Sequence, residues 1–175
     1  AGLYTSEIPS SAHGHSDLLS FTLSIVGKPL VVDGGFYTYD EDPHWHRYFR
    51  EASAHNTVLV DGASHANYHL SHASRLFDYV ESSHAGFFGV SPAVCHRRSI
   101  FHDRDKAWLI LDHLAGKGAH RVEAFFHLAP SQATPLGDGQ GILIETDLGL
   151  NAELEVYDWP DCQIEVITGG EGPDG

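Results

Sequence analysis

Histidines and one aspartate near the start of this sequence have the residue types and spacing of a metal site. His13 and His15 are separated by one glycine, and in an extended strand residues i and i+2 point to the same side. Asp33 ends the apolar segment 29–33, which we expect to return antiparallel to the strand after His15. His55 opens a further predicted strand. Because zinc takes three or four nitrogen, sulfur or oxygen ligands, His15, Asp33 and His55 are a candidate His-Asp-His site.

Other interpretations of these residues stay open. The sequence contains 14 histidines against 10 lysines and arginines together, so a His-x-His pair also arises by chance. In cupins a carboxylate ligand follows the second histidine by a few residues, and Asp17 is too close to His15 for that pattern. The two cysteines are too few for a zinc knuckle or a disulfide scaffold. Four further histidines in a polar stretch are expected to be exposed loop residues: His65, His69, His72 and His84.

Short β-strands are expected to position these side chains. Apolar residues at every second position of segment 19–25 alternate with serine and threonine, which is the pattern of a half-buried strand. Asp42 and Pro43 begin the clearest helical pattern, one to three turns within residues 40–55. Further strands are expected at residues 56–62, 75–82, 94–101, 107–115, 120–129, 141–146, 152–158 and 162–168. The pattern predicts one all-β domain over residues 1–175, an antiparallel β-sandwich of jelly-roll-like arrangement.

The composition excludes several classes of protein. A formal net charge of -14 argues against nucleic acid as a partner, because counterion release needs a basic surface. No apolar run is long enough to span a membrane. An anionic substrate would have to meet local basic groups such as Arg47 with Arg50. The sequence lacks methionine and its ends look like cut edges, so we expect a piece of a longer protein, with periplasmic and cytoplasmic locations both open.

Several motifs together resemble one family. They are "HGHSDLLSFTLSIVGKPLVVDGGFYTY" at 13–39, "WHRYFREASAHNTVLVDG" at 45–62, "RRSIF" at 97–101 and "HRVEAFFHLAP" at 120–130. In this order and spacing they are similar to the heparinase II/III-like polysaccharide lyases, which include alginate and oligoalginate lyases. The resemblance covers about residues 12–130. Ser16 in place of the usual alanine is a departure that touches no proposed ligand.

The resemblance implies a two-part enzyme. An N-terminal (α/α) toroid precedes an antiparallel β-domain, the active-site cleft lies between them, and this chain is similar to the β-domain without the toroid. The family's motif, carried over residue by residue, implies zinc ligands at His15, Asp33 and His55. The same motif implies a cleft-facing catalytic role for His13, and its Tyr-x-Tyr falls on Tyr37 and Tyr39.

The chemistry implied by the resemblance is β-elimination at a uronic acid. The C5 proton becomes acidic once the carboxylate is neutralised, after which a base removes it and an acid protonates the departing O4. His13 would neutralise the carboxylate or act as the base, and Tyr39 is the second catalytic candidate. The zinc is expected to be structural. We therefore expect activity on a heparan sulfate-like or alginate-like polysaccharide in the full-length protein and none in the isolated chain.

The alternative is a non-catalytic carbohydrate-binding β-sandwich braced by the metal. In it, aromatic side chains such as Trp45 and Tyr48 would hold the sugar. The candidates for substrate binding in either case are Tyr37, Trp45 and Arg50. Expected partners are a uronic-acid-containing polysaccharide and the toroid of the same protein, and the sequence is also compatible with a homodimer.

Overall fold

The computed structural model describes residues 2–3, 14–36, 42–64, 73–76, 79–87, 89–103, 107–137, 139–147, 149 and 151–169. One sheet contains β1 (Gly2–Leu3), β2 (Phe21–Ile25) and β3 (Lys28–Val31), and another pairs β4 (Val58–Val60) with β9 (Val122–Ala124). A four-stranded sheet contains β5 (Ala73–Leu76), β6 (Tyr79–Ala85), β7 (Cys95–Asp103) and β8 (Ala107–Ala115). The last sheet contains β10 (Ser131–Pro135), β11 (Gly141–Thr146) and β12 (Asn151–Glu155). Every pairing is antiparallel, which confirms the predicted all-β class.

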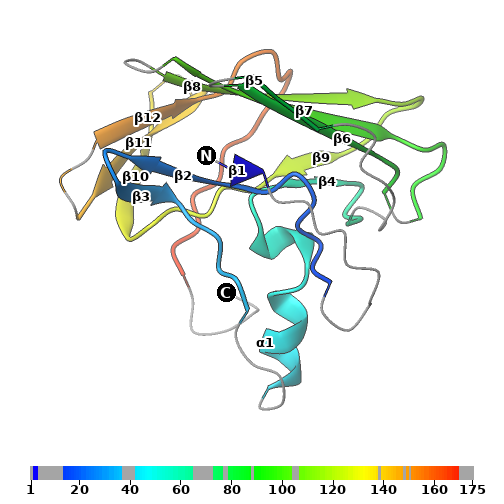
Figure 1. The fold of residues 1–175 in the computed structure, drawn as a ribbon, viewed down its shortest axis with the longest axis horizontal. Helices are drawn as coiled ribbons and strands as arrows, with labels where there is room; N and C mark the ends of the chain where they lie inside the picture. Colours follow the sequence, from blue (N-terminus) through cyan, green and yellow to red (C-terminus); the bar gives the residue numbers. More distant parts are fainter. Residues whose placement is uncertain are drawn as a thin grey trace.

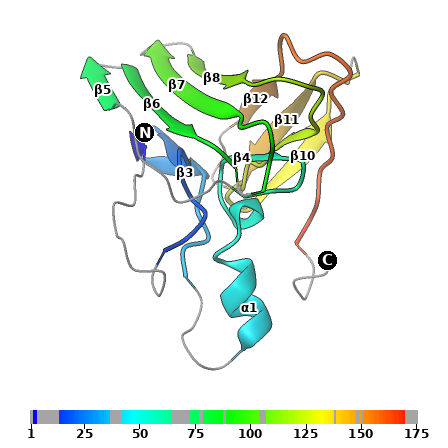
Figure 2. The same ribbon diagram turned by 90° about the vertical axis from the view of Figure 1, so that its right-hand side faces the viewer.

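The sheets form two layers around a shared core. Figures 1 and 2 show the β5–β8 sheet on one side, with β2, β3 and the β10–β12 sheet facing it. The main apolar cluster joins both layers, because Phe21 of β2 packs with Ile100 of β7 and Ile144 of β11, all at most 2% exposed. Burying these side chains is the main favourable contribution to the sandwich.

Strand β7 shows how the alternating sequence produces a two-sided sheet. His96, Arg98 and Ile100 are buried, whereas Arg97 and Phe101 between and beyond them are exposed. This period of two follows from the pleat, which turns successive side chains to opposite faces. An arginine therefore occupies the core-facing side of the strand.

The predicted hairpin at the start of the chain is confirmed. Strands β2 and β3 pair antiparallel, with Leu23 opposite Val31 and Ile25 opposite Lys28. Val26 and Gly27 both have positive φ, 50° and 74°, as the tight turn of a two-residue hairpin requires. The return of β3 brings the residues after Val31 back toward the loop that precedes β2.

The predicted helix is also confirmed, at a length of less than two turns. Helix α1 (Pro43–Tyr48) begins after Asp42, whose Oδ1 accepts a hydrogen bond of 2.9 Å from the His44 N–H. A short 3₁₀ helix, Ala52–Ala54, follows, and His55 is the residue directly after it. Within the described part of the chain, no helix is long and apolar enough to cross a membrane.

Three local predictions differ from the structure. Residues 162–168 form no strand, because no neighbouring strand pairs with them. The segment predicted as one strand at 75–82 contains parts of β5 and β6, which pair as a hairpin. His84 was expected to be exposed but is 1% exposed, because β6 turns it toward the core opposite His96 of β7. His65, His69 and His72 lie outside the described residues.

Candidate functional site

The segment that contains His15 is hydrogen-bonded to Arg50, which follows α1. The Ser16 N–H donates to the Arg50 carbonyl at 2.9 Å, and Arg50 Nε donates to the Gly14 carbonyl at 3.1 Å. Arg50 was predicted to bind substrate, and in the structure it holds the backbone beside His15. His13 lies outside the described residues.

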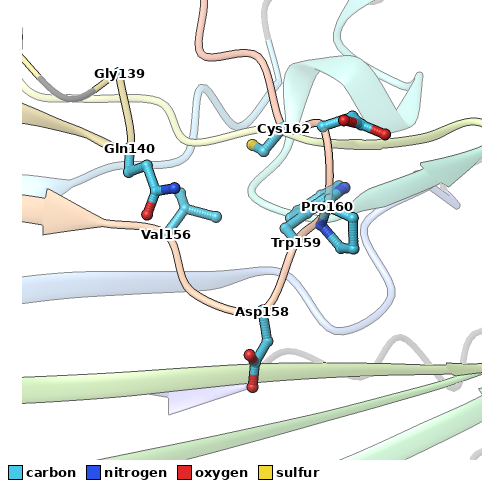
Figure 3. A pocket seen from close by; sticks show the side chains of 8 residues that line it. Gly139, Gln140, Val156, Asp158, Trp159, Pro160 and Cys162 are labelled. Atoms are coloured by element: carbon cyan, nitrogen blue, oxygen red, sulfur yellow. The ribbon is translucent and has the colours of Figure 1, made fainter.

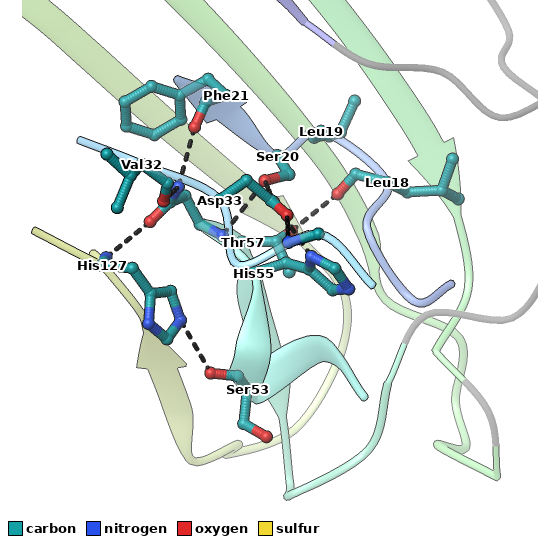
Figure 4. Close-up of polar contacts among 12 residues, drawn as sticks. Leu18, Leu19, Ser20, Phe21, Val32, Asp33, Ser53, His55, Thr57 and His127 are labelled. Atoms are coloured by element: carbon teal, nitrogen blue, oxygen red, sulfur yellow. Dashed lines mark hydrogen bonds and ion pairs between the residues drawn. The ribbon is translucent and has the colours of Figure 1, made fainter. Parts of the chain in front are cut away.

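Asp33 and His55 form a hydrogen-bonded pair between two loops (Figure 4). Asp33 Oδ2 lies 3.0 Å from His55 Nδ1, and Asp33 Oδ1 accepts from the Gly35 N–H at 2.8 Å. Burial alone would raise the pKa of Asp33, but the hydrogen bonds from His55 and Gly35 hold it below its usual range. The ionised carboxylate accepts a hydrogen bond from His55 Nδ1.

The second nitrogen of His55, Nε2, is buried and has no hydrogen-bond partner among the residues that the structure describes. His55 is 2% exposed, whereas the Asp33 side chain is 22% exposed. A buried polar atom without a partner costs free energy unless a ligand, ion or water satisfies it. This nitrogen is therefore a candidate ligand atom for a further group.

His15 lies next to this nitrogen-bearing ring. The ring centroids of His15 and His55 are 5.4 Å apart, so the prediction that His15, Asp33 and His55 are neighbours is consistent with their positions. Burial and the neighbouring His55 lower the pKa of His15, which favours a neutral imidazole. Among the described residues, no group of three His, Cys, Asp or Glu side chains has the spacing of an assembled metal centre.

Asp17 adds a carboxylate to the same neighbourhood. Its Oδ1 atom is buried without a hydrogen-bond partner. Burial raises the pKa of Asp17, although the nearby His55 and His15 oppose that shift. Asp17 was not predicted as a site residue, and the only sequence signal for it is its place two residues after His15.

Asn56 is a buried residue of this site that was not predicted from the sequence. Its Nδ2 donates to the carbonyls of Phe21 and Val32 at 2.8 and 2.7 Å, and its Oδ1 accepts from the His127 N–H at 2.6 Å. The side chain thereby joins β2, the end of β3 and the segment after β9. The only sequence signal was its place directly after His55 in the motif "AHNTV".

Comparison with known proteins identifies the family. The family model described as "Heparinase II/III-like, C-terminal" matches residues 3–165. The chain belongs to the heparinase II/III-like C-terminal domain family. The predicted membership of a polysaccharide lyase family is confirmed by this match. No curated protein matches the sequence.

A solved structure supports the same fold for this heparinase II/III-like domain. The protein titled "Heparinase III-BT4657 gene product" superposes with a TM-score of 0.69 at 19% sequence identity. The match covers 85% of this chain and 24% of that chain, so the domain corresponds to about a quarter of the heparinase III chain. At this identity the likeness establishes the fold.

Of the remaining predicted residues, Trp45 lies on α1 of this heparinase II/III-like domain. Trp45 stacks on Phe49 with ring centroids 5.7 Å apart, and Tyr48 packs edge-on against Trp45 at 5.8 Å. All three side chains are partly buried. Tyr37 and Tyr39 lie outside the described residues. A line of rings from His46 through Phe36 to His15, at 5.8 and 6.0 Å, connects α1 with the Asp33–His55 pair.

A separate pocket lies at the C-terminal side of the domain. Its volume is about 260 Å³ and it is lined by residues 139–140, 156 and 158–162 (Figure 3). None of the predicted site residues lines it. The candidate site at His15, Asp33 and His55 is therefore independent of this pocket.

Proposed function

We propose that this chain is the β-domain of a polysaccharide lyase that cleaves uronic-acid-containing polysaccharides by β-elimination, braced by a zinc ion at His15, Asp33 and His55. The observation that supports the metal site is the meeting of three side chains from separate segments: Asp33 Oδ2 lies 3.0 Å from the His55 ring, and the His15 ring centroid lies 5.4 Å from that of His55. Two imidazoles and a carboxylate are a common ligand set for zinc. The family match supports the lyase assignment.

In this proposal the three ligands bring three chain segments together. His15 lies before β2, Asp33 after β3 and His55 after the 3₁₀ helix. When bound, the zinc would supply positive charge and a rigid link between these loops.

The proposed reaction assigns the proton transfers to residues near this brace. His13, two residues before His15, would neutralise the uronate carboxylate or accept the C5 proton. The electron pair of the C5–H bond then forms the C4–C5 double bond, and the C4–O4 bond breaks. The departing O4 takes a proton from an acid, for which Tyr39 is this chain's candidate. We propose that the (α/α) toroid of the full-length protein completes the cleft.

The metal site is tested by measuring the metal content of the purified chain, prepared without chelators, by mass spectrometry. We expect about one zinc per chain in the wild type and almost none in His15→Ala and Asp33→Asn. The matched control is His113→Ala, at an exposed position of β8, and it should retain the zinc. Folded wild-type protein without metal, or both variants with full metal content, would contradict the site.

The reaction is tested in the full-length protein. The elimination creates a double bond conjugated with the carboxylate, so product is measured by ultraviolet absorbance on alginate and on heparan sulfate. We expect His13→Ala to abolish product formation while leaving the zinc content unchanged. If His13→Ala still binds oligosaccharide and the wild type cleaves neither polymer, a metal-braced binding module replaces the lyase.

A further inference from the structure

The residue that links the core of the sandwich to the candidate site is the buried Arg98. It is 0% exposed and lies on the core-facing side of β7. Its Nε and Nη2 atoms donate to the two carboxylate oxygens of Asp112 on β8, at 2.7 and 2.8 Å. The guanidinium carbon also lies 5.3 Å from the centroid of the Phe21 ring. Arg98 is therefore held in one orientation by a paired carboxylate and an aromatic ring.

The remaining donors of Arg98 reach across the core to the other layer. Its Nη1 atom donates to the carbonyl of Leu19 at 2.8 Å and to the carbonyl of Asn56 at 2.5 Å. Both carbonyls belong to loops that carry candidate site residues. The planar guanidinium can serve both carbonyls and Asp112 at once, which a lysine ammonium cannot do with the same geometry.

Asn56 uses every polar group it has. The Asn56 carbonyl accepts from Arg98, the N–H donates to Ser20 Oγ at 3.1 Å, and the side-chain amide bonds three backbone groups as described above. Asn56 is 0% exposed. A fully satisfied buried amide with partners on several segments fixes the relative positions of those segments.

These contacts converge on the Asp33–His55 pair from both sides. Asn56 directly follows His55 in the chain, and its Nδ2 bonds the carbonyl of Val32, the residue before Asp33. Ser20 provides a second connection, because its hydroxyl accepts from the Asn56 N–H and donates to Asp33 Oδ2 at 3.3 Å. The spacing of Asp33 and His55 is thus set by Asn56 rather than by the sequence between them.

We propose that Asn56, held in place by Arg98, is a positioning residue that fixes the hydrogen bond between Asp33 Oδ2 and His55 Nδ1. The consequence is that the Asp33 carboxylate and the His55 ring are kept at one spacing, with the Nδ1 proton of the metal-free ring facing the carboxylate. The effect of Asn56 on the His55 ring is inferred from the hydrogen bonds of the structure. The effect of Asn56 on zinc binding rests on the proposed function.

The primary test is the nitrogen NMR spectrum of the His55 ring in the metal-free protein. In the wild type we expect a protonated Nδ1 and an unprotonated Nε2. Asn56→Asp keeps the shape of the side chain but replaces the donor to the Phe21 and Val32 carbonyls with an acceptor. We expect this variant to lose the single tautomer, and to bind added zinc about 10- to 100-fold more weakly.

The matched control is Thr57→Val. Thr57 is also 0% exposed, and its hydroxyl donates to the Leu18 carbonyl at 2.7 Å rather than to Asp33 or His55. This variant should lose stability in urea while keeping the wild-type His55 tautomer and zinc affinity. The control therefore separates a general loss of stability from a loss of positioning.

If Asn56→Asp does not fold, the Arg98→Lys variant tests the positioning role of Asn56 instead. It keeps a positive charge near Asp112 but loses the Nη1 group that donates to the Leu19 and Asn56 carbonyls. The proposal predicts mixed His55 tautomers in folded Arg98→Lys. Wild-type ring signals in whichever of the two variants folds would overturn it. If the wild type binds no zinc, the proposed metal site fails, while the ring spectrum still tests the positioning role.

Discussion

Replacing Asp112 with asparagine tests how strongly the buried ion pair supports this domain. Arg98 is 0% exposed, and the Asp112 side chain is 18% exposed. Asp112 accepts two hydrogen bonds from Arg98 and a third from His96 Nε2 at 2.8 Å. Asp112→Asn preserves the shape of the side chain but leaves the Arg98 charge unbalanced in the core. Breaking a buried ion pair by removing one partner costs about 3–5 kcal/mol.

The assay is urea unfolding at neutral pH. With a slope of about 2 kcal/mol per molar urea, a loss of about 4 kcal/mol lowers the midpoint by about 2 M. The matched control is Asp103→Asn, at the exposed end of β7, which should change the free energy of unfolding by less than about 0.5 kcal/mol. If the free energy of unfolding of Asp112→Asn is within about 1 kcal/mol of that of this control, the ion pair does not stabilise the domain by the expected amount.

The same pair predicts a pH dependence. Burial alone would raise the pKa of Asp112, but the Arg98 guanidinium and His96 hold it well below its usual value of 3.8. A carboxyl group whose pKa is lower in the folded state binds fewer protons there than when unfolded. Its stabilisation is therefore complete above about pH 4 and is lost as the pH falls through the lower folded pKa. In Asp112→Asn, the free energy of unfolding measured in urea should therefore fall less steeply with decreasing pH below about pH 4 than it does in the wild type.

Two further predictions concern the periphery of the domain. Gly141→Ala would place its Cβ 2.7 Å from the Leu154 carbonyl oxygen, so we expect a loss of about 1–3 kcal/mol in urea unfolding, with Gly137→Ala, which has open space, as the near-neutral control. The hydrogen bonds to Asp61 and to the Lys117 carbonyl raise the pKa of the half-buried His120 above its usual value of 6.5. In Asp61→Asn, NMR titration should therefore find a lower His120 pKa, and an unchanged value would refute the pairing.

The local elements of this protein were largely determined by sequence pattern. Alternating apolar residues predicted the hairpin of β2 and β3, and Asp42 with Pro43 predicted the start of α1. These features depend on contacts between near neighbours in the chain. Residues 162–168 have a similar alternation yet form no strand, because a strand also needs a partner edge, which local pattern does not specify.

The sequence predicts which residue types form the candidate site, but it does not predict the hydrogen bonds that hold them in place. The spacing of His15, Asp33 and His55 was sufficient to predict that they lie near one another, since a hairpin brings its two ends together. The period of two in β7 places Arg98 on one face with His96 and Ile100, but it does not say which face meets the core. The bonds of Arg98 to Leu19 and Asn56 join residues 79 and 42 positions apart in the sequence.

Only the tertiary structure decides which distant groups meet in the core. Register between β6 and β7 buries His84 opposite His96, and the packing of the two layers brings Arg98 to the carbonyl of Asn56. Buried polar groups must find hydrogen-bond partners wherever the fold supplies them. The sequence by itself therefore determined which side chains could do chemistry, and the packing of the layers determined how they are held.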